Sequence, residues 1–448
     1  MNSITPHLQQ LHAPMLAATQ TLVRIPSVLD ENNATYPFGQ AVHEALQKAV
    51  DIAAELGLRT WYDGAGYYAW AEIGQGEELL GILGHMDVVP AGNPDKWITP
   101  PFQPDVRDGK LYGRGVEDDK GPMMAALFAT KALMDAGIQF NKRIRFIFGG
   151  DEENHWRGIK RYFAQEEMPT FGFTPDAAFP LIFAEKGILQ VKLSAAHAGD
   201  LPHLKLGSAF NAVPGEALYT GPQQDELAAA LDTLQYPYTR TDAGLLALGK
   251  AAHASTPEKG SNAITHLALG LNALGCKAKT IQFLAQAAGD DYRAQAIFGP
   301  LRDDVSGPLS FNIGKLSIDE QTETLCIDMR IPVTADKALV TEPLQAAAAR
   351  FGLTYSEHAW KPSLYVPLNH PLVETLMTVY RQATGNTQAQ PLAIGGGTYA
   401  RAMPNCVAFG PGFPGSPETA HQANEFIIIQ EMYQAMAIYA EAIYKLTR

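Results

Sequence analysis

A histidine and an aspartate lie two residues apart directly after an apolar segment near the start of the chain. The motif is Gly84-His85-Met86-Asp87, and it follows the predicted strand 79–83. Because side chains at positions i and i+2 of a strand face the same way, His85 and Asp87 project together at its carboxyl end. Ligands of open α/β sheets collect at such ends. The pair fits a metal ligand with the carboxylate that orients it, and it also fits a solvated turn.

A glycine-punctuated loop over residues 113–121 contains three consecutive acids, Glu117, Asp118 and Asp119. It directly precedes a helix predicted for residues 122–136. Carboxylates are stabilised near helix N-termini, so these acids could serve as a helix cap. Three acids exceed what a cap requires, however, and one carboxylate can bridge two cations.

Three further motifs supply nitrogen and oxygen donors. Glu152 and Glu153 follow the predicted strand 144–148, where one acid can coordinate a metal while the other holds a proton. Asp176 precedes an apolar run, and His421 precedes the last predicted helix. Each of these two residues by itself also fits a structural role. Together with the motifs above they supply the ligands expected for two metal ions about 3.5–4 Å apart, with no thiolate among them.

The elements that must position these residues alternate between helix and strand patterns. Helices are predicted for 7–23, 39–56, 122–136, 225–234, 262–274, 342–351, 371–383 and from about Phe426, and strands for 68–73, 79–83, 144–148, 188–193, 309–316 and 324–333. We therefore predict an α/β fold in which a mixed β-sheet is flanked by helices. The catalytic domain comprises residues 1–186 and 362–448, and an α+β domain at 187–361 interrupts it.

Composition limits the partners of this chain. Lys and Arg total 34 against 47 Asp and Glu, a formal charge of -13 (34 minus 47), which argues against nucleic acid or an anionic membrane. The three cysteines, Cys276, Cys326 and Cys406, are widely spaced, which indicates a reducing compartment. With no membrane-length apolar stretch and no signal-like start, a cytoplasmic protein is predicted.

Several stretches resemble the co-catalytic zinc peptidases and deacylases of the acetylornithine deacetylase, succinyl-diaminopimelate desuccinylase and carboxypeptidase G type. They are GHMDVVPAG, the Trp97 to Phe102 segment, LYGRGVEDDKGP, GGDEEN and ETAHQANEF, and they stand in the family's order. Within the family, NAVPG, GKAAHAS and GGGTYARAMPNCVAFGPGFPG resemble the PepV-type dipeptidases. The resemblance implies a zinc-peptidase-like catalytic domain interrupted by a lid domain.

The resemblance also implies a site for two divalent metal ions, with zinc expected and manganese or cobalt as alternatives. His85 and Asp176 would hold one metal, and Glu153 and His421 would hold the other. Asp118 would bridge both, and the peptide bond after it would be cis. Asp87 would orient His85, and Glu152 would be the general base for the attacking water.

Residues of the lid are assigned to substrate binding by the same resemblance. Asn211 and His253 fall where polar groups polarise the scissile carbonyl and stabilise the oxyanion. Arg330 falls where a cation binds the substrate carboxylate, and backbone N–H groups of Gly396, Gly397 and Thr398 would bind the same group. The length of the inserted segment favours a monomer, because PepV-type enzymes supply within one chain what dimeric relatives take from a partner's lid.

The sequence thus predicts a metal-dependent dipeptidase that acts on dipeptides with a free C-terminal carboxylate. A deacylase of N-acyl amino acids is the alternative, since it shares the metals and the base and differs in how it treats the substrate's N-terminus. Asp119 and Glu117 are candidates for binding a free α-amine, and the sequence does not rank them. An inactive binding homologue would have lost Glu152 or a metal ligand, whereas all are present.

Overall fold

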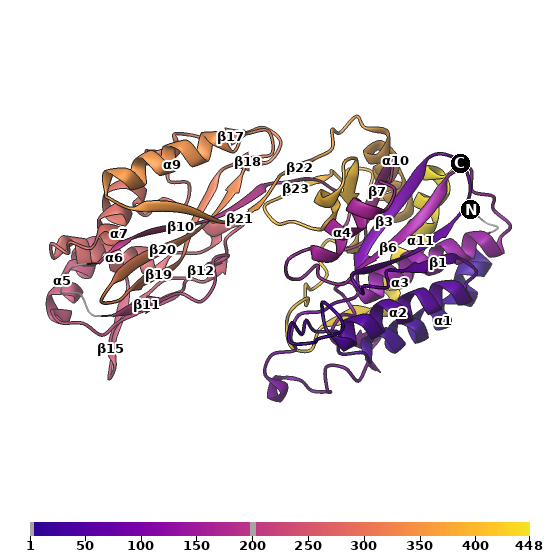
Figure 1. Cartoon of the computed structure of the whole chain (residues 1–448), viewed down its shortest axis with the longest axis horizontal. Helices are drawn as coiled ribbons and strands as arrows, with labels where there is room; N and C mark the ends of the chain where they lie inside the picture. Colours follow the sequence, from indigo (N-terminus) through magenta and orange to yellow (C-terminus); the bar gives the residue numbers. More distant parts are fainter. Residues whose placement is uncertain (1–3, 198–202) are drawn as a thin grey trace. The chain divides into compact units, whose positions relative to one another are not determined.

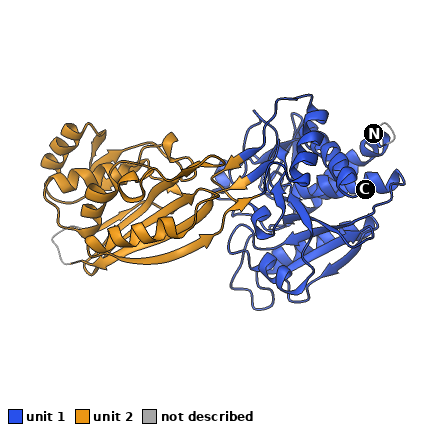
Figure 2. Ribbon diagram, turned by 90° about the horizontal axis from the view of Figure 1, so that it is seen from above, with its two compact units in different colours: residues 1–183, 366–392, 398–448 blue, residues 184–365, 393–397 orange. Residues whose placement is uncertain are grey.

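The computed structural model describes residues 4–197 and 203–448, and it divides the chain into two compact units (Figures 1 and 2). The first unit comprises residues 1–183, 366–392 and 398–448, and the second comprises 184–365 and 393–397. The chain therefore leaves the first unit and returns to it. This arrangement confirms the predicted fold class, an α/β domain interrupted by an α+β domain.

A mixed sheet has the strand order β1-β2-β6-β3-β7-β24-β9-β22, with β23 beside β9, and the strands β1, β2, β6, β3, β7 and β24 form the centre of the first unit. The strands are β1 (Arg59–Tyr62), β2 (Tyr68–Ile73), β3 (Leu79–His85), β6 (Arg143–Gly149), β7 (Phe171–Thr174), β9 (Ile182–Glu185), β22 (Leu364–Tyr365), β23 (Leu392–Ile394) and β24 (Cys406–Ala408). Strand β3 pairs in parallel with β6 and β7, and β7 pairs in parallel with β24. Because parallel strands end at the same edge, the segments after β3, β6 and β7 emerge together.

Helices cover this sheet, and they are α1 (Thr5–Val23), α2 (Gln40–Glu55), α3 (Lys120–Asp135), α4 (Arg157–Gln165), α10 (Pro371–Thr384) and α11 (Ile429–Leu446). Helix α3 packs against α1 and α11, while α2 packs on β1 and β2 (Figure 1). Strand β3 is buried along its whole length, which explains its continuous apolar run. Helix α3 begins at Lys120 and not at Pro122, because proline is tolerated in the first turn.

The C-terminal helix begins three residues later than predicted. Residues 426–428 form a strand, β26 (Phe426–Ile428), which pairs with β5 (Lys110–Tyr112), and β5 pairs in turn with β4 (Asp105–Arg107). This long-range pairing overrides the local helical pattern. It also brings the loop after residue 112 beside the segment before residue 426.

The second unit is built on an antiparallel sheet with the strand order β11-β19-β20-β10-β21. Its strands are β10 (Gly187–Ala196), β11 (Leu204–Leu206), β19 (Ser310–Ile318), β20 (Thr322–Ile331) and β21 (Thr354–Lys361), and its longer helices are α5 (Gln224–Leu234), α6 (Ala263–Ala273), α7 (Lys279–Phe283) and α9 (Ala338–Arg350). Helices α6, α7 and α9 pack on this sheet and enclose one apolar core (Figure 1). The alternating burial along β10 shows which face of the sheet meets that core.

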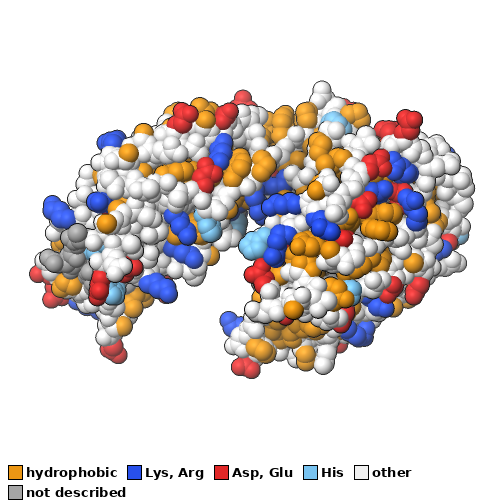
Figure 3. All heavy atoms as spheres, viewed as in Figure 1, with side chains coloured by type: hydrophobic (Ala, Val, Ile, Leu, Met, Phe, Trp, Pro, Cys, Tyr) orange, Lys and Arg blue, Asp and Glu red, His pale blue; other side chains and the backbone are white. Residues whose placement is uncertain are grey.

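Short elements complete both units. They are β8 (Ala177–Ala178), β12 (Ala212–Val213), β13 (Glu216–Tyr219), β14 (Tyr238–Thr241), β15 (Gly244–Leu248), β16 (Ala252–His253), β17 (Arg302–Asp303), β18 (Gly307–Pro308), β25 (Pro411–Gly412), α8 (Gln295–Phe298), η1 (Pro94–Lys96), η2 (Pro257–Lys259), η3 (Leu284–Ala288) and η4 (Tyr399–Ala402). Acidic and basic side chains are interspersed over the face shown in Figure 3. Within the described ranges, no helix is long and apolar enough to cross a membrane.

Gly172 provides a test of the sheet that positions the site. A Cβ atom at Gly172 would lie 2.3 Å from the carbonyl oxygen of Gly81 on the neighbouring strand. Both backbones lie inside the sheet and cannot move apart, so Gly172→Ala should lower the free energy of unfolding by about 3 kcal/mol. Urea unfolding measures this change. Gly64→Ala is the control, because nothing lies within 4 Å of its Cβ position; equal losses in the two variants would contradict the argument.

Candidate metal centre

Five chain segments position the predicted metal ligands in the first unit. His85 is the last residue of β3, Glu153 follows β6, and Asp176 follows β7. Asp118 lies two residues before α3, whose N-terminus meets the end of β3. The pairing of β26 with β5 brings the loop that carries His421 beside the loop that carries Asp118.

Among the residues that the structure describes, two groups of side chains present potential metal-binding atoms within 4.8 Å of one another. The first is His85, Asp118 and Asp176, and the second is Asp118, Glu153 and His421. In the first group, His85 Nε2 lies 2.9 Å from Asp118 Oδ1 and 3.7 Å from Asp176 Oδ2. In the second, His421 Nε2 lies 2.9 Å from Asp118 Oδ2 and 3.0 Å from Glu153 Oε1. Each oxygen of Asp118 therefore faces a different histidine.

The tautomer of His85 follows from its hydrogen bonds. Its Nδ1 lies 2.9 Å from the backbone carbonyl oxygen of Asp87, which can only accept, so Nδ1 carries a proton. In the neutral ring this leaves the Nε2 lone pair directed at Asp118 and Asp176. The Asp87 carboxylate lies 3.5 Å from Nδ1 and accepts the backbone N–H groups of Glu152 and Glu153 at 3.1 and 3.2 Å. Asp87 thus connects the end of β3 to the two glutamates.

Electrostatics show what the cluster is suited to bind. Burial raises the pKa of Asp176 well above its usual value, and the charge of Asp118 raises it further. Burial also raises the pKa of Glu153. Burial opposes ionisation of Asp118 as well, but hydrogen bonds from His421 and His85 outweigh it and hold that pKa well below its usual range. Hydrogen bonds to Asp118 and Glu153 raise the pKa of His421 to about 10.

These carboxylates are therefore crowded and poorly solvated, and positive charge between them stabilises their ionised forms. Two imidazoles and three carboxylates, with no thiolate, are a donor set that suits borderline and hard divalent cations. The residues fit two such ions that share Asp118. Glu152 belongs to neither group, although its charge raises the pKa values of Asp119 and Asp176, so it lies beside the cluster.

Glu425 is a residue of this region that the sequence patterns did not single out. Its Oε1 accepts the backbone N–H groups of Gly115 and Glu117 at 3.0 and 2.9 Å, and its Oε2 accepts Arg114 Nη1 at 2.6 Å. The Arg114 and Glu425 side chains are 2% and 1% exposed. Burial raises the pKa of Glu425 to about 7, opposed by the charge of Arg114. Glu425 therefore holds the loop that presents Asp118, and its place in the ETAHQANEF stretch is the only sequence signal for it.

The two acids beside Asp118 accept hydrogen bonds from the protein itself, although Asp119 Oδ1 has no hydrogen-bond partner among the described residues. Glu117 Oε2 accepts both the backbone N–H and the hydroxyl of Thr419, at 2.8 and 2.5 Å. Asp119 is fully buried, and its Oδ2 accepts the backbone N–H of His85 at 3.2 Å. The bond between Asp118 and Asp119 is cis, as expected.

Asn211 and His253 lie together in the second unit. Ala212 pairs with His253 between β12 and β16, and the Asn211 carbonyl oxygen accepts the N–H of Ala254 at 2.9 Å. His253 Nδ1 accepts the backbone N–H of Ser255 at 3.2 Å, and the Ser255 hydroxyl lies 2.7 Å away. Nδ1 is thus an acceptor, so the neutral ring carries its hydrogen on Nε2. Burial lowers the pKa of His253, and the charge of Arg330 lowers it further.

Arg330 and the glycine segment also meet in the second unit. Arg330 Nη1 donates to the carbonyl oxygen of Gly395 at 2.7 Å. Gly396 and Gly397 follow in the same unit, whereas Thr398 belongs to the first unit, where its hydroxyl accepts the N–H of Ala400 at 3.1 Å. The predicted residues therefore form two groups, the metal ligands with Asp87, Glu152 and Thr398 in the first unit and the remaining substrate-binding residues in the second.

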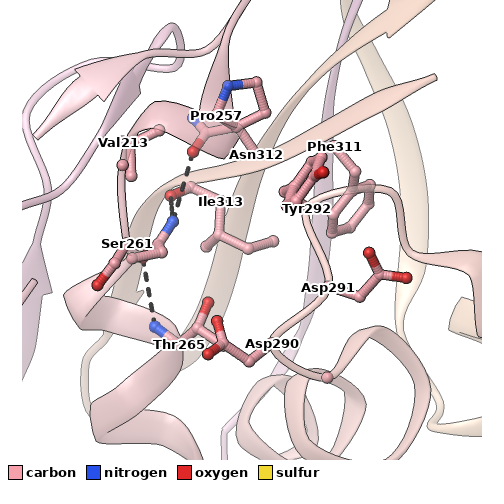
Figure 4. Close-up of a pocket in the computed structure, with 13 residues that line it drawn as sticks. Val213, Pro257, Ser261, Thr265, Asp290, Asp291, Tyr292, Phe311, Asn312 and Ile313 are labelled. Carbon is pink, nitrogen blue, oxygen red and sulfur yellow. Dashed lines mark hydrogen bonds between the residues drawn. The ribbon is translucent and has the colours of Figure 1, made fainter. Parts of the chain in front are cut away.

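A separate cavity of about 160 Å³ lies in the second unit, and the rings of Tyr292 and Phe311 form one of its walls (Figure 4). No predicted site residue lines it. Its two acids already have structural partners: Asp291 accepts the backbone N–H groups of Arg293 and Gln295, and Asp290 accepts the hydroxyl of Tyr236. We assign no chemistry to this cavity.

The fold and the paired ligand groups define a hydrolase of the metallopeptidase class. Residues 81–445 match the sequence model of peptidase family M20/M25/M40. Because this match spans most of the chain, the chain belongs to this family. A relative from Bacillus subtilis (strain 168), named "Putative dipeptidase YtjP", is 38% identical over 459 residues, covering 97% of each chain. These findings confirm the family that the sequence motifs indicated.

Solved structures show the same fold at low sequence identity. Human carnosine dipeptidase 1 is 15% identical with a TM-score of 0.62, covering 100% of this chain and 98% of that one. The dipeptidase Dug1p from Saccharomyces cerevisiae is 15% identical with a TM-score of 0.60, covering 99% and 98%.

The role of Glu425 can be tested by Glu425→Gln. The amide NH₂ would face either Arg114 or the backbone N–H groups, so a donor would meet donors. Breaking a buried charged pair costs about 3–5 kcal/mol, and we expect a loss of this order in the free energy of unfolding, measured in urea without metal. Zinc affinity measured by calorimetry should also fall.

Glu418→Gln is the matched control, because Glu418 lies on the same loop and is exposed. It should change neither quantity. If Glu425→Gln bound zinc as tightly as the unchanged protein, Glu425 would not position Asp118.

Proposed function

We propose that this protein is a metal-dependent dipeptidase that hydrolyses dipeptides with a free C-terminal carboxylate. The observation that carries the proposal is the shared Asp118, whose two oxygens face two ligand groups in a member of a peptidase family. The name of the 38% identical relative supports dipeptides as the substrate class.

Two divalent metal ions, with zinc expected, belong to the proposed site. His85 and Asp176 would hold one ion, Glu153 and His421 would hold the other, and Asp118 would bridge them. When bound, the ions polarise the scissile carbonyl and lower the pKa of the attacking water.

Glu152 is the proposed general base. Its backbone N–H is held by Asp87, so the loop position of Glu152 is tied to the end of β3. It takes the proton from the attacking water and can return it to the leaving amine. Asp87 contributes by orienting His85, through its backbone carbonyl oxygen first and its carboxylate second.

In the second unit, His253 is the proposed donor to the oxyanion. Its neutral tautomer carries the hydrogen on Nε2, which is what a hydrogen-bond donor to a developing negative charge requires. Asn211 lies beside it as a second polar group. Arg330 is proposed to bind the substrate carboxylate, with backbone N–H groups of Gly396, Gly397 and Thr398.

The proposal extends to cellular context. The formal charge of -13 argues against nucleic acid and anionic membranes as partners. The cysteines are free, which is consistent with a cytoplasmic location. We propose a monomer because of the length of the inserted segment.

One observation favours the deacylase alternative. A free α-amine requires an acidic partner, yet Glu117 is bound to Thr419 and Asp119 is fully buried. Glu117 is therefore not a ready acceptor for an ammonium group, and Asp119 offers only its buried Oδ1, which has no hydrogen-bond partner within the part of the chain that the structure describes. A deacylase acting on N-acyl amino acids would not need such an acceptor.

Glu152→Ala tests the base. We expect kcat to fall by at least about a hundredfold, because general acid–base catalysis contributes about 10²–10⁴-fold. Metal content, measured by elemental analysis, should stay at two ions per chain. Glu153→Ala is the comparison, since it should lose metal; unchanged turnover in Glu152→Ala would remove that residue as the base.

A substrate panel separates dipeptidase from deacylase. The metal-loaded protein should hydrolyse dipeptides such as Ala-Leu and Leu-Gly faster than N-acetyl-leucine or N-succinyl amino acids. Amidation of the dipeptide C-terminus should lower kcat/KM at least about tenfold, the effect of losing about 1.4 kcal/mol of binding. Amino acid release measured by chromatography decides the matter, and cleavage of acyl substrates alone would refute the dipeptidase proposal.

A further inference from the structure

Arg330 forms a buried ion pair with Asp328, two residues earlier on β20. Nε lies 2.6 Å from Asp328 Oδ1 and Nη2 lies 3.3 Å from Oδ2. The two side chains are 3% and 0% exposed. Because residues i and i+2 of a strand share a face, the carboxylate lies alongside the guanidinium and contacts it through two nitrogens.

Asp328 is itself held in place by the neighbouring strand. Gln190 lies opposite Asp328 in the pairing of β10 with β20, and Gln190 Nε2 donates to Asp328 Oδ2 at 2.8 Å. The carboxylate therefore cannot rotate without losing a bond to Gln190 or to Arg330. Its position is set by the sheet and not by a flexible loop.

The remaining donors of Arg330 can be counted. A guanidinium has five N–H groups. Asp328 takes one from Nε and one from Nη2, and the Gly395 carbonyl oxygen takes one from Nη1 at 2.7 Å. Two N–H groups are left, one on each terminal nitrogen. This pair of donors is what a carboxylate binds in a bidentate contact.

The residues that contact Arg330 are also linked to His253, the proposed donor to the oxyanion. A Cβ atom at Gly395 would lie 2.8 Å from Ser255 Cβ, so Gly395 packs directly on Ser255. The Ser255 hydroxyl lies 2.7 Å from His253 Nδ1. Contacts therefore run from Asp328 through Arg330, Gly395 and Ser255 to His253, all within one unit.

We propose that Asp328 is a positioning residue for substrate recognition. It holds the Arg330 guanidinium in one orientation, so that the two remaining donors are presented as a pair to the substrate carboxylate. Because the ion pair is internally neutral, recognition depends on directed hydrogen bonds more than on net charge. This inference rests on the proposed role of Arg330. It adds Asp328 as the residue that makes carboxylate binding by Arg330 selective.

A double-mutant cycle tests this role, using Asp328→Asn, Arg330→Lys and both together, each loaded with zinc. In Asp328→Asn, an NH₂ group would face Nη2 or Nε, so the guanidinium should turn away. We expect KM for a dipeptide to rise tenfold or more, with kcat changed less than about twofold. Since 1.4 kcal/mol corresponds to about tenfold, this is the loss of one good hydrogen bond. The C-terminal amide of the same dipeptide should show no such rise.

In the Arg330→Lys background, Asp328→Asn should have no further effect on KM. Equal effects in both backgrounds, or equal effects on the free acid and the amide, would show that Asp328 serves stability alone. If Arg330→Lys itself left KM unchanged, the proposed role of Arg330 would fall first, and this inference with it.

Two further variants keep the test interpretable. Asp225→Asn is the matched control, because Asp225 Oδ1 pairs with Arg240 Nη2 at 2.7 Å in the same unit but with both side chains exposed. It should leave KM unchanged. If circular dichroism shows that Asp328→Asn does not fold, Gln190→Met removes the support of Asp328 and keeps its charge. That variant should raise KM for the free acid by a smaller factor, and an unchanged KM would overturn the inference.

Discussion

The sharing of one carboxylate between two histidines is the constraint on which the first unit depends. Asp118 directs Oδ1 at His85 and Oδ2 at His421, each at 2.9 Å. These histidines are separated by most of the chain, so a strand end, a helix start and a C-terminal loop must meet within a few ångströms. The parallel strands supply the common edge, and the pairing of β26 with β5 brings the last segment to it.

This convergence explains features of the sequence that carry no chemistry. A Cβ atom at Gly84 would lie 2.2 Å from Asp119 Oδ2 and 2.3 Å from Met123 Cγ, so only glycine lets α3 approach the end of β3 this closely. Glu425 likewise satisfies backbone N–H groups of a loop that has no regular structure. Such residues hold the metal ligands in position. A buried N–H group without a hydrogen bond would lower the stability of the fold, and Glu425 prevents this in the loop.

Some strands and site residues can be predicted from the sequence, and others cannot. Local patterns located the strands that end near His85 and Glu153, because a continuous apolar run followed directly by polar residues is typical of a buried strand that ends at a sheet edge. They did not distinguish Asp118 from its neighbours Glu117 and Asp119, which the family motif did. The sequence patterns do not single out Asp328, although its partner Arg330 lies only two residues away on the same strand. They also do not single out Glu425, because its partners are backbone N–H groups and a side chain that only folding brings near. The start of α11 was misplaced for the same reason, since the partner of residues 426–428 lies more than three hundred positions earlier.

The two units carry opposite kinds of polar chemistry, and this follows from what each must stabilise. The first unit gathers carboxylates whose burial opposes ionisation, so it is built to hold positive charge. The second presents hydrogen-bond donors: His253, whose pKa is lowered by burial, and Arg330, whose positive charge is balanced by the neighbouring carboxylate of Asp328. Donors held in fixed positions bind negative oxygens through directed hydrogen bonds. The donors of the second unit suit negatively charged oxygens, and the acids of the first unit suit cations.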